Sequence, residues 1–142
     1  MGKFLTPLKV ELIQHEPALW KLTEPLIYDS NSLNSLIIVP AGTVTNFASV
    51  PRIPIAYMIT GGIGNAAATL HDWLYTNPHY SGVGLGIVTR KQADKVLLGA
   101  AIDGMRIEGD GLGTAIYNQI NYLRAKMMYL AVRLFGAGHW DN

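Results

Sequence analysis

Residues 70–75 read Leu-His-Asp-Trp-Leu-Tyr, and this stretch decides the fold because titratable and aromatic side chains meet here inside an apolar region. No charged residue occurs from Ile53 to Leu70, and His71 and Asp72 then follow directly. Histidine changes its charge near neutral pH, and a neighbouring carboxylate or hydroxyl can orient its ring. Two interpretations are open. His71 is either a chemically active group or a hydrogen-bonded core histidine, with Asp72 as a partner or cap for a neighbouring loop.

A helix is predicted from Asn65 to about Tyr75, with Asn65 as its N-cap. At helical spacing Ala67, His71 and Tyr75 lie one turn apart on one face, whereas Asp72 points to an adjacent face. A hydroxyl near the imidazole is one of the groups that can orient it.

Two further helices are predicted. Thr89 caps the first, Gln92 completes a capping-box pattern, and the helix runs to about Met105. Its apolar face comprises Ala93, Val96, Leu97, Ala100 and Ala101, with Asp94 near the edge.

The last helix is predicted from about residue 113 to 135 and ends at Gly136 and Gly138. Its core stripe is predicted to comprise Ile116, Ile120, Leu123, Met127, Leu130 and Leu134, and its solvated side Arg124, Lys126 and Arg133.

The first third of the chain is predicted to form strands. Apolar residues alternate with polar ones over residues 8–12, as in a half-buried strand, and Pro17 ends this run. Further strands are predicted at residues 19–23, with residues 26–28 continuing that run beyond Pro25, and at residues 36–39 and 43–45.

These patterns predict an α+β fold, in which a small, mainly antiparallel N-terminal sheet of three to five strands packs against three C-terminal helices. A chain of 142 residues is expected to form a single domain, residues 1–142. Within it we expect a strand-rich half over residues 1–50 and a helical half over residues 51–142.

The composition limits the partners. Hydrophobic residues make up 49% of the chain and charged residues 15%, so we expect part of the surface to be covered by a partner or by copies of itself, as in a homo-oligomer. The net charge of +1 does not favour nucleic acid. The absence of cysteine excludes disulfides, thiolate zinc sites and a cysteine nucleophile.

No targeting or membrane segment is predicted. The first residues lack the long apolar core of a signal peptide. The uncharged run over residues 53–70 contains a proline and three glycines, which would interrupt a bilayer helix, so we interpret it as buried protein.

Residues 46–52, Asn-Phe-Ala-Ser-Val-Pro-Arg, are predicted to form an ordered loop between the two halves. Arg52 presents a fixed fork of donors to an anion or a carboxylate. In the alternative interpretation Ser49 caps a helix start and Arg52 pairs with a carboxylate, for which Asp72 and Asp94 are the favoured partners.

Several motifs carry a resemblance to a known family. They are residues 39–42, residues 45–52, residues 71–75, Arg90 with Ala93 and Asp94, and Met128-Tyr129 with residues 131–133 and Gly136. Over roughly residues 20–136 the chain resembles the uncharacterised "domain of unknown function 1353" family of bacteria, phages and prophages. Asn46 stands where the family pattern has aspartate, which weakens any role that needs a charge there. The resemblance implies phage or prophage origin, in the host cytoplasm or the virion, with other phage proteins as partners.

A second resemblance concerns the mechanism. A His-Asp pair, an aromatic turn and a later Asp on another helix are similar to the helical core of secreted-type phospholipases A2. That resemblance implies His71 as the base that activates water, Asp72 as a calcium ligand and Asp94 as the group that orients His71, with Tyr75 hydrogen-bonded to Asp94. Carbonyl groups of residues 61–64, Gly-Gly-Ile-Gly, would supply further calcium ligands. The chain departs from that family in having no cysteines and no complete calcium-loop motif.

Two functions therefore compete. The first is a non-catalytic phage component, in the virion or acting on the host, in which His71, Asp72, Asp94 and Arg52 form a buried polar network. The alternative is a phage-encoded hydrolase that uses His71 and Asp94, and calcium is expected only in this case. Both predict that an imidazole nitrogen of His71 lies within hydrogen-bond distance of the Asp94 carboxylate.

Overall fold

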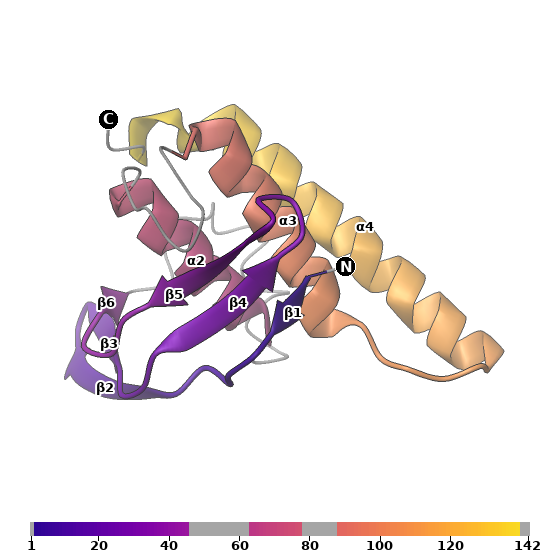
Figure 1. Cartoon of the computed structure of the whole chain (residues 1–142), viewed down its shortest axis with the longest axis horizontal. Coiled ribbons are helices and arrows are strands. Elements are labelled where there is room, and N and C mark those ends of the chain that lie inside the picture. Colours follow the sequence, from indigo (N-terminus) through magenta and orange to yellow (C-terminus); the bar gives the residue numbers. More distant parts are fainter. Residues whose placement is uncertain (1, 46–62, 78–87, 140–142) are drawn as a thin grey trace.

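The computed structural model describes residues 2–45, 63–77 and 88–139, in which strands precede helices along the chain (Figure 1). The strands are β1 (Lys3–Phe4), β2 (Val10–His15), β3 (Ala18–Leu22), β4 (Leu26–Ser30), β5 (Ser35–Val39) and β6 (Val44–Thr45). The helices are α2 (Ile63–Thr76), α3 (Arg90–Met105) and α4 (Leu112–Phe135), followed by the short 3-10 helix η1 (Gly136–His139). The predicted α+β class is confirmed.

The strands form two antiparallel sheets of three strands each, in the orders β1-β4-β5 and β2-β3-β6. The prediction of one sheet is therefore refined to two. The prediction that residues 26–28 continue the preceding strand beyond Pro25 is wrong. These residues begin β4, which belongs to the other sheet. Proline cannot donate a hydrogen bond to a strand ladder, so β3 ends at Leu22 and the chain crosses between the sheets.

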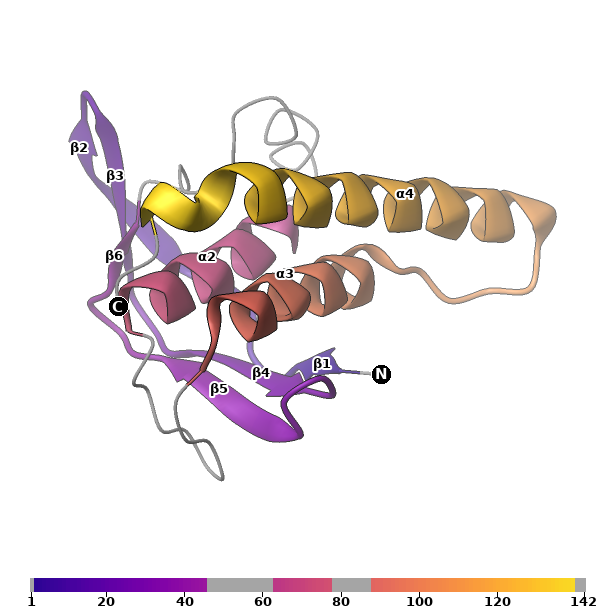
Figure 2. The same ribbon diagram turned by 90° about the horizontal axis from the view of Figure 1, so that it is seen from above.

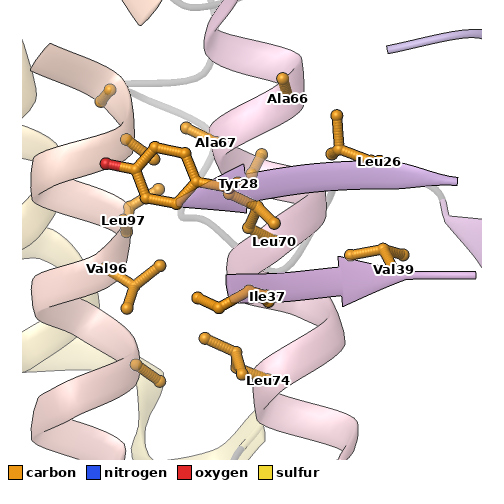
Figure 3. Packing of buried hydrophobic residues seen from close by; sticks show 14 of the residues in the cluster. Leu26, Tyr28, Ile37, Val39, Ala66, Ala67, Leu70, Leu74, Val96 and Leu97 are labelled. Carbon is orange, nitrogen blue, oxygen red and sulfur yellow. The ribbon is translucent and has the colours of Figure 1, made fainter. Parts of the chain in front are cut away.

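The core lies between the β1-β4-β5 sheet and helices α2 and α3 (Figure 3). Burial alternates with period two along β4 and β5, so one face of this sheet points to the helices. The sheet contributes Leu26, Tyr28, Ile37 and Val39, and the helices contribute Ala66, Ala67, Leu70, Leu74, Val96 and Leu97. The hydroxyl of Tyr28 donates a hydrogen bond of 2.5 Å to Asp103 Oδ2 on α3, which ties the sheet to that helix.

The helices form two layers over this sheet (Figure 2). Helix α3 contacts α2, α4, β1 and β4, and α4 is the outermost element on that side. In the described parts of the chain, no helix is long and apolar enough to cross a membrane.

The helix starts are partly as predicted. The Thr89 hydroxyl accepts from the backbone N–H of Gln92, and the Gln92 side chain accepts from the Thr89 N–H, which confirms the capping box of α3. Asn65 is not an N-cap, because α2 already begins at Ile63. The Asn65 carbonyl instead accepts a hydrogen bond from the Thr69 hydroxyl one turn later.

The predicted core stripe of α4 is wrong. All six of its members are exposed, and the buried residues of α4 are Asn121, Ala125, Met128 and Val132. Small side chains such as Ala125 let the backbones of two helices approach closely, and the Asn121 amide donates to the Met105 carbonyl at the end of α3. Periodicity reveals an apolar stripe but not what the stripe contacts. Helix α4 packs on α3 through the opposite face.

Candidate functional site

Asp94 is the centre of a buried polar cluster that joins all three helices. Its Oδ1 lies 2.8 Å from His71 Nε2 and accepts a hydrogen bond of 2.5 Å from the Tyr75 hydroxyl. Its Oδ2 accepts a hydrogen bond of 2.8 Å from Arg133 Nη1. The side chains of His71 and Asp94 are both 0% exposed. The predicted contact between His71 and Asp94 is therefore confirmed.

Local structure explains how these side chains reach one another. His71 and Tyr75 are one turn apart on α2, and their rings lie 4.1 Å apart between centroids with a tilt of 41°. The capping box at Thr89 sets the start of α3 and so the direction in which Asp94, in the second turn, points. Arg133 reaches Asp94 from the last turn of α4.

Arg90 links the cluster to the end of α4. Its Nη2 donates to the carbonyls of Val132, at 2.6 Å, and Arg133, at 2.8 Å, and its Nε donates to the Tyr75 hydroxyl at 3.3 Å. The last carbonyls of a helix lack partners within the helix, so a cation there stabilises the helix end. Arg90 Nε also lies 4.0 Å from Asp94 Oδ2.

Sequence reasoning did not assign either arginine to the site. Arg133 was predicted to lie on the solvated side of α4, and its side chain is 31% exposed, but the prediction missed that its guanidinium is bonded to Asp94. A signal existed for Arg90, since it precedes Asp94 by four residues on one helix. No local pattern connects Arg133 to a residue so distant in the chain.

The hydrogen bonds fix the protonation states of the cluster. Burial by itself would raise the pKa of Asp94, but the hydrogen bonds from His71, Tyr75 and Arg133 bring it below its ordinary value, so Asp94 is ionised. A carboxylate only accepts hydrogen bonds, so Nε2 of His71 carries the hydrogen. Burial lowers the pKa of His71 despite the opposing effect of Asp94, and the ring is neutral at pH 7.

The second ring nitrogen of His71 is therefore a free base. Nδ1 carries the lone pair and is buried, yet it has no hydrogen-bond partner among residues 2–45, 63–77 and 88–139. Buried polar atoms are nearly always hydrogen-bonded, so such an atom calls for an explanation.

Asp72 lies beside this cluster on the adjacent face of α2. Its Oδ2 accepts a hydrogen bond of 3.1 Å from the Thr45 hydroxyl on β6, and its Oδ1 is buried without a hydrogen-bond partner in the described part of the chain. Burial raises the pKa of Asp72 to about 7, and the bond from Thr45 offsets only part of that effect.

The fit to a cation is partial. The free oxygen of Asp72 fits one ligand position of a hard cation such as Ca²⁺, which takes six to eight oxygen ligands. No cluster of three or more His, Asp or Glu side chains that could hold a metal ion occurs in the described segments. Residues 61 and 62 of the predicted calcium loop lie outside them, as do Ser49 and Arg52, so the partner of Arg52 stays a prediction.

Substitution of Asp72 by asparagine is expected to change how stability depends on pH. The folded protein retains a proton on Asp72 up to about pH 7, whereas an ordinary Asp releases it near pH 3.8. The stability from this group is thus fully present below about pH 4 and is lost as the pH rises through 7. Relative to wild type, Asp72→Asn should gain on the order of 4 kcal/mol between pH 4 and pH 8.

Urea unfolding in the presence of a chelator measures this difference, since a bound cation would also lower the pKa. Asp110→Asn, at an exposed loop carboxylate, is the control and should show no such trend. A difference between Asp72→Asn and wild type that is independent of pH would contradict the prediction.

Gly136 leaves room for the Tyr75 hydroxyl. A Cβ at this position would lie 2.7 Å from Tyr75 Oη and 3.4 Å from Arg90 Nη2. Gly136→Ala should therefore push Tyr75 away from Asp94 and lower the free energy of unfolding by about 1–3 kcal/mol.

Removal of the Tyr75 hydroxyl tests whether its clash with the added Cβ causes the loss of stability. In the Tyr75→Phe background, Gly136→Ala should cost less than in wild type, so the two changes are not additive. Gly113→Ala, in the first turn of α4, is the control, because nothing lies within 4 Å of the added Cβ. Equal losses for Gly136→Ala and Gly113→Ala in thermal unfolding would refute the steric explanation.

Comparison with known proteins identifies the family. The sequence pattern of a family described as protein of unknown function (DUF1353) matches residues 20–109. No curated protein and no solved structure matches the chain at a significant level. The matched region includes α2 and α3, with His71, Tyr75, Arg90 and Asp94, whereas Arg133 lies beyond it. Because the match covers well over half of the chain, the protein belongs to the DUF1353 family of proteins of unknown function.

Proposed function

We propose that the protein is a hydrolase in which His71 acts as the general base. The observation that carries this proposal is a neutral histidine whose Nε2 lies 2.8 Å from an ionised Asp94 and whose Nδ1 lone pair has no hydrogen-bond partner among the described residues. A base must be unprotonated at working pH, and a carboxylate on its other nitrogen stabilises the imidazolium that forms during the reaction.

The reaction we propose is hydrolysis of an ester. Nδ1 of His71 takes a proton from water, and the resulting hydroxide adds to the ester carbonyl carbon to give a tetrahedral oxyanion. When the carbon–oxygen bond to the alcohol breaks, the Nδ1 proton passes to the departing alkoxide. Asp94 remains ionised throughout and holds the Nε2–H, while Tyr75 and Arg133 hold Asp94.

Asp72 has a separate role in this proposal. Its Oδ1, which has no hydrogen-bond partner in the described part of the chain, would contribute to a calcium site beside the base, and a bound ion would supply positive charge for the developing oxyanion. The order of these groups along the chain is the one that resembles phospholipases A2, so phospholipids are the ester class we favour. The motif resemblance also leads us to place the protein in a phage or prophage.

The direct test is turnover by the purified protein. Vesicles of phospholipid and short-chain soluble esters would be incubated with the wild type, with calcium or with chelator, and the released acid titrated. We expect release from at least one ester, and more of it with calcium. No release from any substrate by protein shown to be folded would overturn the proposal.

One observation favours a second function. His71 and Asp94 are completely buried, and their cluster ties the three helices together. This is what a purely structural network requires, in a non-catalytic phage component of the virion or one that acts on the host. In that case substitutions in the cluster should change stability and partner binding in parallel.

A further inference from the structure

The outer face of α4 carries a continuous apolar seam. We define this seam as the six side chains Ile116, Ile120, Leu123, Met127, Leu130 and Leu134. Their exposed fractions run from 45% for Ile120 to 73% for Leu134. The buried residues of α4 lie on the opposite face of the helix, so α3 and the seam occupy different sides of α4. Figure 2 shows α4 along one side of the molecule, beyond α2 and α3.

The spacing along the seam is that of a coiled coil. Successive seam residues are separated by four, three, four, three and four positions, which is the alternation of a and d positions in a heptad. Ile120, Met127 and Leu134 occupy a positions, and the other three occupy d positions. A seam restricted to a and d positions is narrower than the apolar face a globular core requires, and it is typical of a helix paired with another helix.

We propose that the seam binds the seam of a second copy of this chain, in a parallel two-stranded coiled coil. A two-fold axis places the same surface of both copies in contact, so a self-complementary stripe needs no other partner. Burial of one large apolar side chain removes on the order of 100 Å² from water. Two seams of six side chains each would therefore bury roughly 1,000 Å², which is at the lower end of specific interfaces.

The charges beside the seam select the parallel direction. Helix α4 contains no acidic residue, and Arg124 and Lys126 lie on the two flanks of the seam. In a parallel pair, g positions face the next e positions, so Gln119 faces Arg124 and Lys126 faces Ala131 of the other copy. An antiparallel pair with all seam residues matched would instead place Arg124 against Arg124 and Lys126 against Lys126. Like charges in direct contact destabilise an interface, so the parallel pair is favoured.

The first experiment measures oligomeric state by sedimentation equilibrium on the full chain. We expect a dimer for wild type, and a double variant Leu123→Lys/Met127→Lys should weaken dimerisation at least a hundredfold. Both side chains are more than half exposed, so the variant should keep its fold, which far-UV circular dichroism verifies. The control variant Lys95→Ala, on the exposed face of α3, should dimerise as wild type does.

The second experiment tests the direction, and the absence of cysteine in the chain makes it unambiguous. In a parallel pair, Leu130→Cys places two sulfurs across the seam within disulfide range, and oxidation should give a covalent dimer. In the antiparallel pair the two positions are about 15 Å apart along the helix, and no bond forms. Lys91→Cys, exposed on α3, is the control and should not cross-link.

Two results would overturn the proposal. One is a wild type that stays monomeric at every concentration tested, with no cross-link at residue 130. The other is a monomer that binds vesicles of anionic phospholipid through the seam, as judged by loss of binding in Leu123→Lys/Met127→Lys. That result would assign the seam to a lipid surface.

Discussion

Replacement of Asp94 by alanine is expected to lower the free energy of unfolding by about 3–5 kcal/mol at pH 7. The carboxylate accepts hydrogen bonds from His71, Tyr75 and Arg133, which come from two other helices. Its removal deprives His71 Nε2, the Tyr75 hydroxyl and Arg133 Nη1 of their shared acceptor. The loss should therefore be far larger than that of an average surface substitution.

Urea unfolding of the wild type and the variant measures this loss. Asp110→Ala, at an exposed carboxylate, is the matched control and should change stability by less than about 0.5 kcal/mol. The pH dependence gives a second measure. Because the pKa of Asp94 lies below the ordinary 3.8, its contribution is present above about pH 4 and is lost in more acid solution. A loss below about 1 kcal/mol for Asp94→Ala would show that the cluster does not hold the helices together.

Replacement of His71 by asparagine should reduce ester hydrolysis by about a hundredfold to ten-thousandfold if His71 is the general base. Asparagine keeps a polar side chain next to Asp94 but has no lone pair of suitable basicity in place of Nδ1. The same change should cost about 1–3 kcal/mol of stability by leaving polar groups unsatisfied. Turnover must therefore be measured at a temperature where both proteins are folded.

Two comparisons separate a catalytic histidine from a structural one. Tyr75→Phe also removes a hydrogen bond to Asp94 but leaves Nδ1 in place, so it should lower stability with a much smaller loss of turnover. For the wild type, burial lowers the pKa of His71, so the acid limb of the rate profile should lie below pH 6.5. Equal losses of activity in both variants, each explained by unfolding, would favour the structural function.

The three helices could be predicted from sequence because their signals are local. The apolar period, the capping box at Thr89 and the glycine after Phe135 identify where α3 and α4 begin or end. The common face of His71 and Tyr75 also follows from helical spacing alone. The resemblance to phospholipases A2 implied that His71 meets Asp94. The distance of 2.8 Å between His71 Nε2 and Asp94 Oδ1 confirms this contact.

The same local signals placed several residues incorrectly. The alternation that predicted strands did not show that β4 begins a different sheet from β3. The strongest apolar stripe of α4 was assigned to the core, yet it is exposed. Arg133 was assigned to solvent, yet it bonds Asp94.

The sequence by itself determined the α+β class, the periods of the helices and the residues that share each helix face, since these depend on spacing within a few turns. Only the tertiary structure decided which face of α4 packs on α3 and that Arg133 completes the cluster around Asp94. Those choices depend on whether side-chain volumes and hydrogen-bond partners from distant segments match in space. A helix with an apolar stripe on one face and small residues on another can satisfy two different neighbours, and its own sequence does not say which of them is present.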